Sequence, residues 1–175
     1  MNVSKKIFIF LIFLTFSLNS LNAEEKVFYV DMDYIITNTL TGKSLLSSLK
    51  EEEELKISKF KSSDKDFKNE EKIILAKKNL ISQEEINKEL KSLQLKFQKY
   101  RKEKIKEIDN FKVKKNRNIM NFINLINPII QKYMEDNSIY MLLDKKNVFI
   151  ASRDYDITNN LIELIDNQIK TIEIK

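Results

Sequence analysis

The longest regular pattern in the chain is a series of residues spaced three or four positions apart between residues 86 and 133. Twelve of its fourteen positions are apolar, which predicts one long helix with a coiled-coil seam. The seam consists of Ile86, Leu90, Leu93, Phe97, Tyr100, Lys104, Ile108, Phe111, Lys115, Ile119, Phe122, Ile126, Ile129 and Tyr133. Pro128 falls inside this helix near its end, where it is expected to kink the helix or loosen a turn.

A thinner apolar stripe precedes this seam. Leu49, Phe60, Phe67 and Ile74 are spaced 11, 7 and 7 residues apart, which keeps their side chains on one helix face. The pattern predicts a helix that starts near residue 34, continues past the single glycine at position 42 and reaches residue 78. Such a helix is roughly 65 Å long at about 1.5 Å per residue.

A helix stop and a helix start separate the two stripes. Ser82 followed by Glu85 is a capping box, in which each residue satisfies a backbone N–H of the other. Lysines precede this point and glutamates follow it. The helix dipole favours cations at the C-terminus of a helix and anions at the N-terminus of the next. We therefore predict a tight turn at residues 79–82 and an antiparallel hairpin. One continuous helix is the alternative, because serine and glutamate also occur at this spacing inside helices.

Short apolar runs at both ends of the chain predict strands. Residues 27–30 and 139–143 are rich in β-branched, aromatic and aliphatic side chains, and residues 148–151 follow a polar turn as the expected third strand of a hairpin. A last helix is expected to open at Asp156. The predicted fold is α+β, mainly α: a long antiparallel coiled-coil hairpin, here called the arm (residues 45–119), projects from a small β-containing body (residues 24–44 and 120–175).

The first 23 residues have the pattern of a secretory signal peptide. Two lysines precede a 12-residue apolar run, and a small residue, Ala23, stands at the expected cleavage point. An uncleaved inner-membrane anchor is the alternative. The remaining residues, 24–175, form a single predicted domain without cysteine, so no disulfide stabilises it. A long hairpin makes a poor core by itself, which favours oligomerisation.

Charge is distributed unevenly along the chain. Residues 50–117 hold 21 basic and 14 acidic side chains, and residues 81–117 alone hold 12 and 6. In an exported chain, this basic region is expected to meet anionic lipid head groups or acidic segments of another protein, and no nucleic acid. The candidate residues facing lipid or another polyanion are Lys96, Lys99, Arg101, Lys102 and Lys104. The alternative for each of them is an ordinary solvated helix surface.

Residues with catalytic chemistry are scarce. The chain has no histidine, no cysteine and one glycine, so the commonest general base, the most reactive nucleophile and a phosphate-cradling loop are missing. Asp31 and Asp33 follow the first strand, where carboxylates more often end a strand and cap a helix than hold a cation. We predict no catalytic residue, no metal and no cofactor, and therefore no enzyme.

Three segments resemble the Skp/OmpH family of periplasmic chaperones. They are VFYVD at 27–31, TGK at 41–43 and NPIIQKYMEDNSIYMLLDKKNVFIASRDYDIT at 127–158. Their order spans essentially the whole chain after residue 24. The resemblance implies a homotrimer in which strands build the body and three arms surround a cavity. It further implies that the cavity holds unfolded outer-membrane β-barrel proteins without ATP, and that the arms contact anionic lipid or lipopolysaccharide.

These implications give two further sets of candidate residues. The expected oligomer body contains Val27, Phe28, Tyr29, Val30, Ile139, Tyr140, Leu142, Val148 and Phe149. The expected client-binding side chains are Phe60, Phe67, Ile73, Ile74, Leu80, Leu95 and Phe97. For Phe67, Ile74 and Phe97, packing inside the hairpin is the alternative. The alternative functions are a structural or membrane-tethering coiled coil of the cell envelope, and a module that binds lipid or another polyanion.

Overall fold

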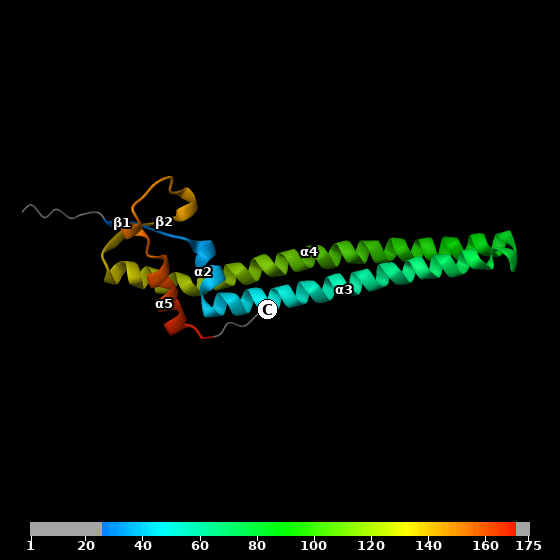
Figure 1. The fold of residues 1–175 in the computed structure, drawn as a ribbon, viewed down its shortest axis with the longest axis horizontal. Coiled ribbons are helices and arrows are strands. Elements are labelled where there is room, and N and C mark those ends of the chain that lie inside the picture. The colour runs from blue at the N-terminus through cyan, green and yellow to red at the C-terminus, as the bar shows by residue number, and fades with distance from the viewer. Residues whose placement is uncertain (1–25, 171–175) are drawn as a thin grey trace, which may run out of the picture.

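The computed structural model describes residues 26–170 and consists of a long helical hairpin attached to a small body (Figure 1). The elements are β1 (Lys26–Val30), α2 (Met32–Asn38), α3 (Leu40–Ala76), a 3-10 turn (Lys77–Asn79), α4 (Gln83–Asp136), β2 (Ile139–Asp144), two further 3-10 turns (Lys145–Asn147 and Arg153–Tyr155) and α5 (Thr158–Gln168). The expected α+β, mainly α fold is confirmed. The predicted signal peptide, residues 1–23, lies outside the described residues.

The chain reverses where the capping box predicted. The Ser82 hydroxyl accepts from the Glu85 backbone N–H at 3.2 Å, and the Glu85 carboxylate accepts from the Ser82 N–H at 3.1 Å. Both N–H groups would otherwise lack a partner at the start of α4. Helices α3 and α4 consequently lie side by side along the arm (Figure 1). Pro128 lies inside α4, which continues beyond it to Asp136.

The single helix expected from residue 34 to residue 78 is wrong, because it is divided at Thr39 into α2 and α3, although α3 does continue past Gly42 as predicted. Its backbone is extended (ψ 150°), and its hydroxyl accepts from the Gly42 N–H at 3.2 Å and donates to the Ile35 carbonyl at 2.9 Å. The Leu40 N–H donates to the Asp166 carboxylate of α5 at 2.7 Å. One threonine therefore ends α2 and caps α3, and α5 anchors the junction to the body.

The body contains a two-stranded sheet in which β1 and β2 run parallel, with Val27 opposite Met141. The third strand expected at residues 148–151 is wrong. The preceding turn winds into a 3-10 helix, where the Val148 N–H donates to the Lys145 carbonyl at 3.1 Å. The chain then leaves the sheet, and Phe149 is fully exposed at 102%. Parallel pairing is possible because the whole hairpin serves as the crossover between β1 and β2.

The main hydrophobic core joins the body to the base of the arm. It contains Val30, Ile35, Leu45, Leu49, Phe111, Phe122, Ile126, Ile130, Ile139, Ile157, Leu161 and Ile165. A second, smaller cluster near the arm tip contains Ile74, Ile86 and Leu93. Among the described residues of α4, none between Leu93 and Phe111 is buried. The middle of the seam is therefore less tightly packed than either end.

None of the helices described between residues 26 and 170 is long and apolar enough to cross a bilayer.

Candidate functional site

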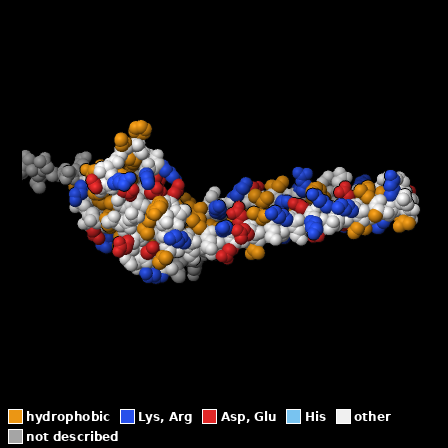
Figure 2. Space-filling view, viewed as in Figure 1, with side chains coloured by type: hydrophobic (Ala, Val, Ile, Leu, Met, Phe, Trp, Pro, Cys, Tyr) orange, Lys and Arg blue, Asp and Glu red, His pale blue; other side chains and the backbone are white. Residues whose placement is uncertain are grey.

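Ion pairs join the two helices along the arm. Four of these pairs, with their nitrogen–oxygen distances, are Lys114–Glu52 at 2.8 Å, Lys59–Glu107 at 3.1 Å, Lys96–Glu70 at 2.8 Å and Lys77–Glu89 at 3.0 Å. Each pair is partly exposed, so each contributes only about 0–1 kcal/mol. Figure 2 shows the resulting surface, on which acidic, basic and hydrophobic side chains alternate along the arm.

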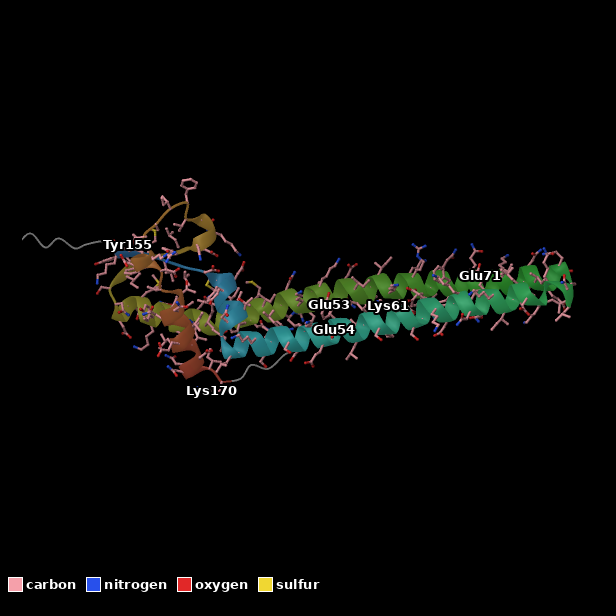
Figure 3. The ribbon with its side chains drawn as sticks, viewed as in Figure 1. Glu53, Glu54, Lys61, Glu71, Tyr155 and Lys170 are labelled. Carbon is pink, nitrogen blue, oxygen red and sulfur yellow. The ribbon has the colours of Figure 1, made fainter. Side chains whose placement is uncertain are left out.

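A groove of about 750 Å³ opens between α3 and α4 in the middle and outer part of the arm. Its apolar lining comprises Phe67 of α3 and Leu90, Leu93, Phe97, Ile105 and Ile108 of α4. None of the charged groups in the four pairs above lines it. These four pairs therefore join the two helices outside the groove lining. Figure 3 labels Glu71, a further lining residue, in the outer part of α3.

Three aromatic rings form the centre of the groove. The Phe67 ring lies 5.2 Å from that of Phe97 and 5.1 Å from that of Tyr100, between ring centroids. These distances and the tilted geometries are favourable for aromatic contacts. The Tyr100 hydroxyl donates to the Phe60 backbone carbonyl at 3.1 Å, which fixes its ring between the helices.

A charged pair replaces an apolar contact at the seam position beside these rings. The Lys104 ammonium lies 2.8 Å from the Asp64 carboxylate and 5.3 Å from the centroid of the Phe60 ring. The hydrogen bond from Lys104 lowers the pKa of Asp64, and the same bond to the Asp64 carboxylate raises the pKa of Lys104. The pair therefore remains ionised at neutral pH and joins α3 to α4 at this level.

The predicted client-binding residues divide into three environments. Phe60 and Ile74 are 7% and 5% exposed and pack between the helices, which for Ile74 is the alternative given above. Phe67 and Phe97 line the groove. The remaining three project from the arm: Ile73 is 60% exposed, Leu80 81% and Leu95 60%.

Most of the predicted polyanion-facing residues already have partners within the arm. Lys96 and Lys104 pair across the hairpin, and Lys99 lies 4.0 Å from Glu103 on its own helix. The Arg101 guanidinium lies 6.0 Å from the centroid of the Phe97 ring. In the part of the chain that is described, Lys102 has no ion pair. Much of the positive charge of this segment is therefore balanced within the arm.

The predicted oligomer-body residues are only partly available at the surface of one chain. Tyr29, Val30 and Ile139 are buried, while Phe28, Leu142 and Val148 are half-buried. Val27, Tyr140 and Phe149 are 37%, 69% and 102% exposed. A second hollow of about 370 Å³ lies among residues that include Val27, Phe28, Val148, Ile150 and Tyr155, the last labelled in Figure 3.

The carboxylates after β1 have structural partners. The Asp31 carboxylate accepts from the Tyr34 N–H at 2.9 Å, which lowers the pKa of Asp31, and it lies 3.2 Å from the Lys145 ammonium. Asp33 pairs with Lys146 at 2.8 Å. These contacts cap α2 and join it to the turn after β2. Within residues 26–170, no three or more acidic side chains are grouped so that they could hold a metal ion.

Sequence reasoning missed the groove: it predicted Leu90, Leu93 and Ile108 only as seam positions, and it did not single out Ile105. A signal was present, because the steps from Tyr100 to Lys104 and from Lys104 to Ile108 are both four residues long. Two such steps depart from strict heptads and put a lysine in the seam, which weakens packing at that level.

Comparisons with known proteins agree with this fold. A family model described as "Outer membrane protein (OmpH-like)" matches residues 26–165. The fold is similar to the crystal structure of a candidate outer membrane chaperone (OmpH-like) from Caulobacter crescentus CB15. The TM-score is 0.76 and the identity 22%, and the alignment covers 84% of this chain and 87% of that chain. None of the curated proteins matches the chain.

Proposed function

Because the chain belongs to the OmpH-like outer membrane protein family, we propose that it is an ATP-independent periplasmic holdase chaperone. It binds unfolded outer-membrane β-barrel proteins between its arms and prevents their aggregation. The observation that carries this proposal is a long charged arm on which large apolar side chains remain exposed. In the proposed mature protein the signal peptide is cleaved near Ala23.

Exposed apolar side chains on the arm support weak, distributed binding. Ile73, Leu80 and Leu95 are each at least 60% exposed. Full burial of such a side chain contributes about 1.5–3 kcal/mol, and partial contact contributes less. Several partial contacts can hold an unfolded chain without locking it, while the charged residues between them keep the free chaperone soluble.

A homotrimer would provide the cavity that a single arm lacks. One chain leaves Tyr140, Phe149 and Ile150 exposed on its body, and its two-stranded sheet is marginal by itself. We place these side chains at contacts between subunits. Phe149→Ser is expected to lower the solution mass of residues 24–175 from about 54 kDa to about 18 kDa, scaled from 20.8 kDa for 175 residues. An unchanged mass would exclude Phe149 from the interface.

Aggregation of an unfolded β-barrel protein, diluted from urea without ATP, tests the holdase function. Residues 24–175 are expected to suppress the light scattering of the barrel protein. Scattering that stays unchanged at a threefold molar excess would contradict the function and favour the tethering coiled coil, which binds folded partners.

The exposed arm residues are tested in the same assay. Ile73→Ser with Leu95→Ser is expected to weaken suppression while circular dichroism keeps its helical signal, because neither side chain is packed. Phe60→Ser, at a buried position, is the comparison that should lose arm stability as well. Equal suppression by the double variant and the wild type would remove Ile73 and Leu95 from the client surface.

Contact with anionic lipid or lipopolysaccharide is a secondary part of the proposal. It would use Lys99, Arg101 and Lys102, whose charges are not paired across the hairpin. Binding to vesicles containing phosphatidylglycerol should fall steeply between low and physiological salt, because exposed charges are screened within about 8 Å at 0.15 M. Client holding through apolar contacts should persist over that range.

A further inference from the structure

The mid-arm groove is preformed in a single chain. The Lys104–Asp64 pair at 2.8 Å and the hydrogen bond from Tyr100 to the Phe60 carbonyl at 3.1 Å join the helices at this level. These polar contacts set the spacing of α3 and α4 without closing the groove over its apolar lining. Phe97 remains 38% exposed there, so the lining can accept further apolar contacts.

The length and lining of the groove suit an extended peptide. Between Leu90 and Ile108, α4 rises by about 27 Å at 1.5 Å per residue. An extended chain covers that distance in about eight residues at 3.3–3.4 Å each. The Phe67, Phe97 and Tyr100 rings are inclined to one another, with centroids 5.1 to 6.1 Å apart. A further aromatic ring can contact this cluster in the same range of distances.

The charges that line the groove favour an acidic occupant. The Lys104–Asp64 pair is neutral as a unit. The other charged lining residues are two cations, Lys68 and Arg101, and one anion, Glu71, so the lining carries one net positive charge. The wider surroundings have the same sign, because the segment that contributes the α4 wall has twice as many basic as acidic side chains.

We propose that this groove binds an extended segment of an unfolded polypeptide, about eight residues long, in which aromatic side chains alternate with acidic or small polar ones. Alternation places the aromatic side chains on one face of the segment, against the Phe67, Phe97 and Tyr100 rings, and the acidic side chains on the opposite face. A long cation of the lining such as Arg101 then attracts these carboxylates across the narrow segment, within the roughly 8 Å over which charges still act in 0.15 M salt. Strands of membrane β-barrels have this alternating pattern. The inference rests on the proposed function and deepens it, because it specifies a place on each arm and a kind of client segment.

A labelled peptide tests the groove directly. The probe is a ten-residue fluorescent peptide that alternates Phe or Tyr with Asp or Thr, and its anisotropy is measured as residues 24–175 are added. Saturable binding is expected. Peptides with Lys in place of Asp, or Ala in place of the aromatic residues, should bind more weakly. Equal binding of all three peptides would overturn the inference.

Two matched isoleucines test the location. Ile105 lines the groove and is 58% exposed, whereas Ile57 on α3 lies outside it and is 45% exposed. Ile105→Ser is expected to weaken peptide binding about fivefold, the effect of losing part of one apolar contact. Ile57→Ser should leave binding unchanged. Equal losses in both variants would place the peptide elsewhere.

Two neighbouring cations test the charge preference. Arg101 lines the groove and Lys102 does not, yet a change to Glu alters the net charge of the chain by the same amount in each case. At 0.15 M salt, Arg101→Glu should weaken binding of the acidic peptide several-fold more than Lys102→Glu does, because screening restricts the effect to nearby charges. Equal effects would show only general electrostatic attraction and would overturn the site.

The outcomes separate the groove from the proposed function. If the wild-type chain suppresses barrel aggregation but the peptide fails to bind, the groove inference fails and the holdase stands. If the peptide binds with the expected differences but aggregation is not suppressed, the holdase fails and the groove stands. A change of solution mass on Ile105→Ser would assign the groove to a second copy of the chain and overturn the peptide assignment.

Discussion

Gly42→Ala tests the junction where the arm leaves the body. A Cβ at this position would overlap the Ile36 carbonyl oxygen and would lie 2.7 Å from the Thr39 hydroxyl oxygen. The first contact is with backbone, which cannot rotate away. The Thr39 hydroxyl also bonds the Gly42 N–H and the Ile35 carbonyl, so a shift there disturbs the cap of α3 as well.

Two opposing effects determine the expected magnitude. Alanine in place of glycine favours a helix by about 1 kcal/mol. Overpacking in a closely packed site costs about 1–3 kcal/mol, and each weakened hydrogen bond costs about 1 kcal/mol more. With one such hydrogen bond weakened, these terms combine so that Gly42→Ala is expected to lower the free energy of unfolding by about 1–3 kcal/mol.

Urea unfolding followed by circular dichroism, at one fixed protein concentration, measures this change. Ser48→Ala is the matched control, because Ser48 is exposed on the same helix and should gain a few tenths of a kcal/mol from propensity alone. If Gly42→Ala stabilised the protein as the control does, the close approach of Ile36 and Thr39 to this glycine would be refuted.

Three further perturbations follow from other parts of the fold. Phe122→Ala removes a fully buried ring from the main core and should lower the free energy of unfolding by about 3–5 kcal/mol in urea; a loss under 1 kcal/mol would contradict its packing. Ser82→Ala removes the α4 cap at about 1 kcal/mol and should speed hydrogen exchange of the first α4 amides, with little change in the global midpoint. Because the pKa of Asp64 is lowered, its ion pair with Lys104 stabilises the fold at neutral pH, and this stabilisation is lost as pH falls through the lowered pKa. Because the pKa of Lys104 is raised, the pair persists until pH rises above 10.5. An NMR titration of the Asp64 carboxyl should therefore have a midpoint below 3.8, and a midpoint at or above 3.8 would contradict the pairing.

Local patterns predicted the hairpin well because its signals lie close together in sequence. Ser82 and Glu85 are three residues apart, and their capping box formed as expected. The seam spacing depends only on helix periodicity, and it correctly identified α4 and the stripe that includes Phe60 and Ile74. Both features follow from a few neighbouring residues and need no knowledge of the rest of the fold.

The failures involve contacts between distant residues. The break at Thr39 depends on a side-chain cap and on the bond from Leu40 to Asp166, a residue more than 120 positions away. The segment around Phe149 has strand-like residues, but a strand also needs a ladder partner, and the 3-10 turn before it directs it away from β2. The residue types of a segment indicate its β propensity, but they do not show whether the edge of another strand is close enough to pair with it.

The groove could be predicted from the sequence only in part. Lys104 in the seam and the four-residue steps beside it indicated weaker packing. The sequence could not show which apolar residues would line the groove, because that depends on how α3 packs against α4 across the hairpin.

Light scattering behind a sizing column, on residues 24–175 alone and with an unfolded outer-membrane β-barrel protein, tests the central claim most directly. We expect about 54 kDa for the free chain, from three subunits of about 18 kDa, and a soluble complex heavier by the mass of one barrel protein. The trimer should elute early for its mass because its arms extend from a small body. A free mass near 18 kDa, together with a barrel protein that precipitates unbound, would contradict the account.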